Sequence, residues 1–227
     1  MKNLIISGGV AHDYEATSPM IAEILTDVSI VSDIVGIQAL ENNTLNEYDM
    51  LTINCVYWTC SQTPDWYDEW HYEMPETAKN NILNFVQTGK GILALHCATI
   101  CFDDFAEYRK ILGAWWDWGK SGHAPYQEQI MRVHTNAHPV VAGLTDFKIK
   151  DELYTNPHIT DSIEPLIEAG WEGVDHPMLW LRKYESARIC YNALGHGVEA
   201  FMNTANRALL KRGALWVNGI NDVGGIY

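Results

Sequence analysis

The first half of the chain alternates short apolar runs with segments of helical periodicity. Strands are expected at residues 4–6, 28–35, 50–56 and 91–95, which are short segments rich in apolar and β-branched residues. Segments with one apolar helix face lie at residues 19–25, 75–89 and 102–112. Strands that alternate with helices predict a mainly parallel sheet with helices on both faces, an α/β fold.

Beyond Gly113 the pattern changes. Short strands with few helical intervals are expected at residues 129–134, 147–149, 165–169, 178–181 and 188–191, followed by a final helix at 201–217. This pattern predicts an antiparallel extension of the sheet. No linker or repeat interrupts the sequence, so we expect one domain over residues 1–227, with long loops at 56–74 and 115–126.

Charge and cysteine content narrow the classes of function. The 227 residues carry a net charge of −14, which disfavours nucleic-acid and membrane-surface binding and favours a neutral small-molecule substrate. Five cysteines without a repeating spacing predict reduced thiols and a cytoplasmic protein. The apolar run at the N-terminus is too short for a signal sequence, and no run is long enough to span a membrane.

Histidines follow several of the predicted strands. His12, His96 and His196 each come at or just after a strand end. Ligands of open parallel sheets bind at the carboxyl ends of the strands, so these side chains are expected to meet in one crevice as proton carriers or metal ligands. The alternative for each is an ordinary hydrogen-bonded or surface histidine.

His96 stands at a tight strand-to-helix turn, the setting in which other enzymes expose a nucleophile. The neighbouring Cys97 suggests a thiol nucleophile with His196 as its base. However, adjacent residues at a strand end point to opposite sides. We therefore expect Cys97 to face away from the crevice and to be structural.

Aromatic residues crowd both long loops. Among them, Trp58 and Trp116 are candidates to stack against the apolar face of a sugar ring. The alternative is that the loops form a lid or the contact between subunits of a homo-oligomer.

Several segments in order resemble the trehalose-utilisation (ThuA-like) family: Gly8-Gly9 with His12-Asp13, residues 89–96, 138–144, 151–154, His176-Pro177 with Trp180, 191–196 and 209–216. The resemblance implies a flavodoxin-like, class I glutamine amidotransferase-like fold. Amidotransferases carry a cysteine where His96 stands and a His-x-Glu pair. Here Glu199 follows His196 one place too late. Glutaminase activity is therefore not expected.

The resemblance also implies further site residues. In the segment 151–154, Glu152 is expected to join the histidines as a catalytic carboxylate and Tyr154 to position substrate. Asp13 and His123 are further candidates for substrate binding. Without the resemblance, the adjacent carboxylates of Asp151 and Glu152 would be interpreted as a solvated acidic turn.

Together these observations predict an enzyme, a hydrolase, lyase or isomerase, acting on a neutral sugar or keto-sugar such as a trehalose-type disaccharide or its derivative. His12, His96, Glu152 and His196 would perform acid-base chemistry. The three histidines would hold a divalent metal ion, zinc first, if the chemistry is metal-assisted. No nucleotide cofactor is expected. The rival hypothesis is a non-catalytic, amidotransferase-like binding or interaction module.

Overall fold

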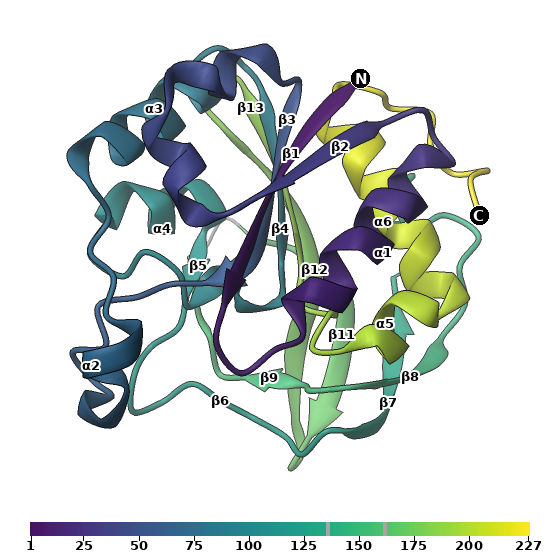
Figure 1. Ribbon diagram of the computed structural model, residues 1–227. Helices are drawn as coiled ribbons and strands as arrows, with labels where there is room; N and C mark the ends of the chain where they lie inside the picture. Colours follow the sequence, from purple (N-terminus) through teal and green to yellow (C-terminus); the bar gives the residue numbers. More distant parts are fainter. Residues whose placement is uncertain (135–136, 161–162) are drawn as a thin grey trace.

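Figure 1 shows the computed structural model, which describes residues 1–134, 137–160 and 163–227. The parallel half of its central sheet consists of β1 (Lys2–Gly9), β2 (Val31–Val35), β3 (Met50–Val56), β4 (Gly91–Leu95) and β13 (Ala187–Asn192). Their order is β2-β1-β3-β4-β13, the flavodoxin-like order. The winding reverses between β1 and β3, which is where such folds bind ligands.

The other half of the sheet is antiparallel. It consists of β12 (Val174–Tyr184), β11 (Pro165–Trp171), β7 (Gln127–Val133) and β8 (Phe147–Asp151), in this order from β13. Outside the sheet, two small antiparallel pairs form between β5 (Ala114–Trp115) and β10 (His158–Ile159), and between β6 (Gly122–His123) and β9 (Tyr154–Thr155).

Helices cover both faces of the sheet (Figure 1). One face carries α1 (Tyr14–Thr26), α5 (Val198–Met202) and α6 (Thr204–Val217), and the other carries α3 (Glu76–Gln87) and α4 (Ala106–Leu112). The short helix α2 (Tyr67–Trp70) and short 3-10 helices at Ile37–Glu41, Asn43–Glu47, Pro64–Trp66 and His96–Thr99 lie in the connections. In the described part of the chain, no helix combines the length and apolar character that crossing a bilayer requires.

The central strands are mostly apolar because both of their faces are covered; the polar Thr52 and Asn54 of β3 are buried with hydrogen bonds to Asn3 and Ser18. Every residue of β3 and β4 is buried, whereas the edge strand β2 is mostly accessible. The predicted mainly parallel sheet with helices on both faces and an antiparallel extension is therefore confirmed.

Three details of the prediction are wrong. The final helix is interrupted at Asn203, whose side chain caps α6 by accepting from the backbone N–H groups of Ala205 and Asn206. The helix expected from residue 102 begins only at Ala106. The strand expected at residues 188–191 in the antiparallel extension joins the parallel and antiparallel halves of the sheet, because β13 pairs in parallel with β4 and antiparallel with β12.

Gly9, at the end of β1, allows the close approach of β1 to β3. Its φ is +111°, and a Cβ built there would lie 2.2 Å from the Val56 carbonyl oxygen. We expect Gly9→Ala to destabilise the fold by at least about 2 kcal/mol, because the added methyl group forces the two strands apart in a strained conformation. Chemical denaturation of the variant measures this loss, and an unchanged midpoint would contradict it.

Candidate active site

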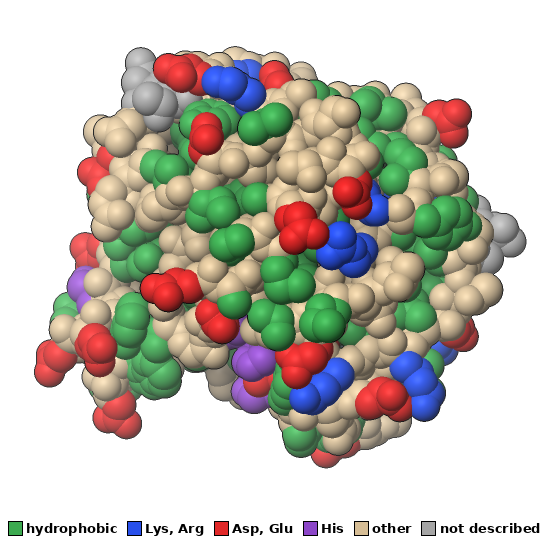
Figure 2. Space-filling model, turned by 45° about the vertical axis from the view of Figure 1, so that its right-hand side comes forward, with side chains coloured by type: hydrophobic (Ala, Val, Ile, Leu, Met, Phe, Trp, Pro, Cys, Tyr) green, Lys and Arg blue, Asp and Glu red, His purple; other side chains and the backbone are tan. Residues whose placement is uncertain are grey.

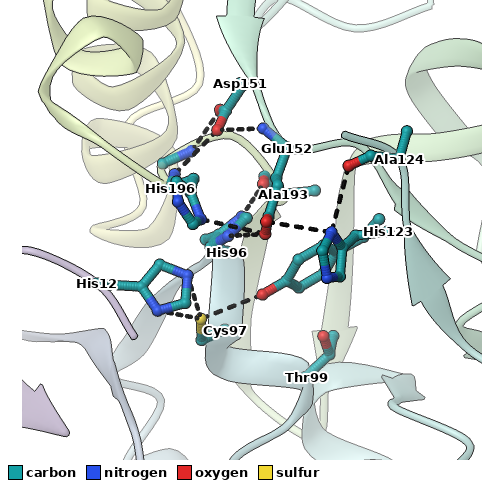
Figure 3. A network of polar contacts seen from close by, with 12 residues as sticks. His12, His96, Cys97, Thr99, His123, Ala124, Asp151, Glu152, Ala193 and His196 are labelled. Atoms are coloured by element: carbon teal, nitrogen blue, oxygen red, sulfur yellow. Dashed lines mark hydrogen bonds and ion pairs between the residues drawn. The ribbon is translucent and has the colours of Figure 1, made fainter. Parts of the chain in front are cut away.

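The carboxyl ends of the parallel strands bring together side chains that are far apart in sequence. His12 follows β1, His96 follows β4 and His196 follows β13, while Glu152 comes directly after β8. One potential ligand atom from each of these residues lies within 4.8 Å of the others (Figure 3). We call these four residues the His/Glu cluster. The predicted proximity is confirmed; the catalytic roles stay predictions.

His96 is held in a strained backbone conformation at the centre of the site. Its φ of +39° lies in the left-handed region, where strain in a non-glycine residue often marks a functional site. The ring Nδ1 lies 2.7 Å from the carbonyl oxygen of Ala193. Because a carbonyl only accepts, Nδ1 donates this hydrogen bond, and Nε2 is the ring nitrogen that faces the site. Nε2 is buried and has no hydrogen-bond partner among the described residues.

His12 approaches the same point from the turn after β1. Its Nδ1 lies 3.2 Å from the carbonyl oxygen of Val10, which leaves the lone pair on Nε2. Burial and the nearby His96 ring lower the pKa of His12 to about 3. The His12 imidazole is therefore neutral at physiological pH, the state that a metal ligand or a general base requires.

Glu152 contacts histidines with both of its carboxylate oxygens (Figure 3). Its Oε2 lies 3.1 Å from Nδ1 of His196 and 3.8 Å from Nε2 of His96, and its Oε1 lies 3.1 Å from Nδ1 of His123. Burial by itself raises the pKa of Glu152, but His196 and His96 outweigh it and hold this pKa below its usual value. In return, the Glu152 carboxylate raises the pKa of His196. Glu152 is therefore an anion at neutral pH.

Asp151 fixes the positions of Glu152 and His196. This fully buried carboxylate accepts hydrogen bonds from the backbone N–H groups of Gly195, His196 and Glu152 at 2.7, 3.0 and 2.9 Å. Gly195 has φ +149°, and a Cβ there would lie 3.1 Å from the Phe201 ring. The turn that presents His196 thus depends on a glycine and on the Asp151 carboxylate.

Strand alternation predicts that Cys97 faces away from the site. In the structure its side chain instead lies beside the cluster. Its Sγ lies 3.3 Å from Nε2 of His12 and 3.1 Å from the hydroxyl oxygen of Tyr154. The prediction is wrong because β4 ends at Leu95 and a 3-10 helix begins at His96, so successive side chains no longer point to opposite sides. Burial raises the pKa of the Cys97 thiol. The sulfur is therefore a neutral thiol beside the cluster rather than a ready nucleophile.

The remaining predicted substrate residues differ in their distance from the cluster. Tyr154 packs its ring against His96 at a centroid distance of 4.2 Å, and the Trp116 ring contacts Tyr154 at 5.1 Å. Trp58 is buried and lines a pocket that His12 also lines. The side chain of Asp13, in contrast, is exposed and caps α1 by accepting from the N–H of Ala16.

The cluster is reachable from solvent. The side chains of His196 and Glu152 are 25% and 13% exposed, whereas that of His96 is 2% exposed. Figure 2 shows histidine side chains at the surface in the lower part of the molecule, between acidic and hydrophobic side chains. A small molecule can therefore approach the cluster from one side.

The donor set of the cluster fits a divalent metal ion. Three imidazoles and one carboxylate are nitrogen and oxygen ligands that zinc accepts in four-coordinate sites. His96 Nε2 is buried without a hydrogen-bond partner in the described part of the chain, and both it and His196 Nδ1 face the Glu152 carboxylate, at 3.8 and 3.1 Å. The Nδ1 contact of His96 with Ala193 is the kind of outer hydrogen bond that orients a metal-bound imidazole.

The fold and the site together define the class of protein. A β2-β1-β3-β4-β13 parallel sheet, with the His/Glu cluster at its carboxyl edge and a strained turn after β4, is a glutamine amidotransferase-like fold. A glutamine amidotransferase from Thermotoga maritima matches with a TM-score of 0.52 and 11% identity, over 85% of this chain and 74% of that chain.

The family follows from a match over nearly the whole chain. The model of the ThuA family, described as trehalose utilisation, matches residues 2–217, and the chain belongs to this family. A ThuA-like protein from Parabacteroides merdae is similar, with 23% identity, a TM-score of 0.79 and coverage of 96% of this chain and 90% of that chain. Another, from Bacteroides uniformis, has 20% identity, a TM-score of 0.69 and coverage of 96% and 91%. A search of curated proteins found no significant match.

Sequence reasoning missed the roles of two side chains at this site. The sequence pattern assigns Asp151 no role beyond its place next to Glu152, although its carboxylate holds the turn at Gly195 and His196. The signal was present, because a carboxylate next to a predicted site residue at a strand end is a candidate to bind backbone N–H groups. Nothing in the sequence indicated that Tyr126 packs its ring against His196.

Proposed function

We propose that this protein is an enzyme that acts on a neutral sugar or keto-sugar, with a trehalose-type disaccharide or its keto derivative as the first candidate. The reaction is a hydrolysis, an elimination or an isomerisation, and the His/Glu cluster is its centre. The observation that carries the proposal is the convergence of four ligand atoms within 4.8 Å at the carboxyl edge of the sheet. The family's description, trehalose utilisation, and the net charge of −14 support a neutral sugar substrate.

Within the cluster, His12, His96 and His196 are proposed to hold a divalent metal ion, zinc first, with Glu152 as their carboxylate partner; three protein ligands would leave a coordination position for substrate or water. When bound, such an ion polarises a carbonyl or activates a water molecule. At neutral pH His12 is already neutral and Glu152 is already an anion beside the three histidines, so neither group has to lose a proton when the ion binds.

The chain's own groups then bind and move protons. His123 is half-exposed and contacts Oε1 of Glu152, so it can carry a proton between the site and solvent. Tyr154 closes one side of His96 and presents its hydroxyl group next to Cys97, which excludes water from the buried side of the cluster.

An activity assay before and after metal removal tests the proposed function. The purified protein is incubated with trehalose, other disaccharides and their keto derivatives, and the products are followed by chromatography. We expect turnover of at least one of these sugars, loss of turnover on chelation and recovery with zinc or another divalent ion. No turnover of any sugar in the panel would contradict the proposal that the protein is an enzyme and would favour the non-catalytic binding module.

We also propose a cytoplasmic location and a homo-oligomer formed through the aromatic loops. All five cysteines are free thiols, and Trp66 and Tyr67 are exposed on the loop that carries α2. Light scattering on the native protein tests the oligomer, and a monomer at all concentrations would contradict it.

A further inference from the structure

A small apolar pocket lies directly beside the His/Glu cluster. It has a volume of about 210 Å³, and its lining includes Trp58, Trp66, Trp118, Val56, Ile100 and His12. We call it the Trp pocket. Because His12 belongs both to this pocket and to the cluster, a molecule in the pocket touches the proposed reaction centre.

The walls of the Trp pocket offer little to a hydroxyl group. The indole N–H of Trp58 donates to the Thr63 hydroxyl oxygen at 3.1 Å, and the indole N–H of Trp118 is buried, without a partner in the described part of the chain, so few polar atoms of the lining are accessible. The Trp58 ring contacts the rings of Trp66 and Trp118 at centroid distances of 6.2 and 6.3 Å. A sugar ring buried here would leave hydroxyl groups without partners, which costs free energy.

The size of the Trp pocket fits one ring. An apolar cavity of about 150 Å³ is enough to bind benzene in another protein. The 210 Å³ available here therefore suits a single aromatic or alicyclic ring and is below the range of about 300 Å³ and more that larger ligands occupy.

A polar cavity of about 360 Å³ lies next to His123, and its lining includes Asn156, Glu172 and His176. This cavity offers the donors and acceptors that a hydroxylated ring needs. His12 lines the Trp pocket, and His123, which contacts Glu152, lines the polar cavity. The cluster therefore adjoins an apolar pocket at His12 and a polar cavity at His123.

We infer that the Trp pocket binds an apolar ring of the substrate, so the substrate is a sugar conjugated to an aromatic or other apolar group. This inference rests on the proposed function, because it takes the His/Glu cluster as the centre at which the sugar reacts. It narrows the substrate from a disaccharide to an amphipathic glycoside.

Calorimetric titration with matched glucosides tests the inference. We expect phenyl glucoside to bind about tenfold or more tightly than methyl glucoside or trehalose, because only the phenyl ring fills the Trp pocket. Trp118→Ala and Trp66→Ala should remove most of this preference. Trp66 is 39% exposed, so its replacement leaves the core intact if the Trp118 variant fails to fold. Trp115→Ala is the matched control, since Trp115 stacks on His158 outside the pocket, and it should keep the preference.

The outcomes separate this inference from the proposed function. Equal affinity for the phenyl and methyl glucosides, or tighter binding of trehalose, would overturn the inference even if the cluster binds metal and turns over a sugar. A phenyl preference that depends on Trp66 and Trp118 in a protein that binds no metal and turns over no sugar would uphold the pocket and refute the proposed function.

Discussion

His96→Ala is expected to lower kcat by at least about a hundredfold, because the change removes the buried imidazole whose free Nε2 faces Glu152. Cys97→Ala, at the neighbouring position, should retain most of the activity. Burial holds the Cys97 sulfur as a neutral thiol, so its loss removes a packing contact with His12 and Tyr154 rather than a nucleophile.

Steady-state kinetics of both variants, on a sugar that the wild-type protein converts, measure the difference. Circular dichroism spectra that match the wild type serve as the control for folding. An active His96→Ala variant together with an inactive Cys97→Ala variant would contradict the account and point to thiol chemistry.

Asp151→Asn is expected to weaken metal binding by about tenfold to a hundredfold without removing a ligand. In the wild-type protein the two carboxylate oxygens accept hydrogen bonds from the backbone N–H groups of Gly195 and His196. Asparagine keeps only one acceptor oxygen, and its NH2 group would face one of these N–H donors. Leaving that buried donor unpaired costs about 1–3 kcal/mol and frees the turn that presents His196.

Two measurements distinguish positioning from general destabilisation in the Asp151 variant. Zinc affinity by titration should fall, and the NMR signals of the His196 ring should broaden or move. Asp13→Asn is the control, because Asp13 is an exposed helix cap and asparagine caps helices as well as aspartate does. A destabilised Asp151→Asn protein with unchanged zinc affinity would contradict the positioning role.

The sequence predicted the central part of the fold because burial on both faces leaves a strong signal. The strands at Met50–Val56 and Gly91–Leu95 are rich in apolar residues, and their observed bounds agree with the prediction. The register and the partner strands of β13 could not be predicted, because the same apolar sequence pattern is compatible with parallel and with antiparallel neighbours. The break at Asn203 was missed because apolar spacing continues across it.

For the site, topology was informative and local orientation was not. Strand ends placed His12, His96 and His196 together, since parallel strands share one carboxyl edge. The position of Cys97 depended on the 3-10 turn at His96, which alternation along a strand cannot anticipate. Likewise, the contact of His123 with Glu152 arises from the pairing of β6 with β9, two-residue strands too short to recognise in the sequence.

Zinc titration of the metal-free protein by calorimetry shows whether the His/Glu cluster is a metal centre. We expect one zinc ion per chain in the wild-type protein, with binding lost or weakened by at least about a hundredfold in His96→Ala and in His196→Ala, and kept in Asp13→Asn. If zinc and other divalent ions fail to bind, or bind equally well after both replacements, the His/Glu cluster is not a metal centre.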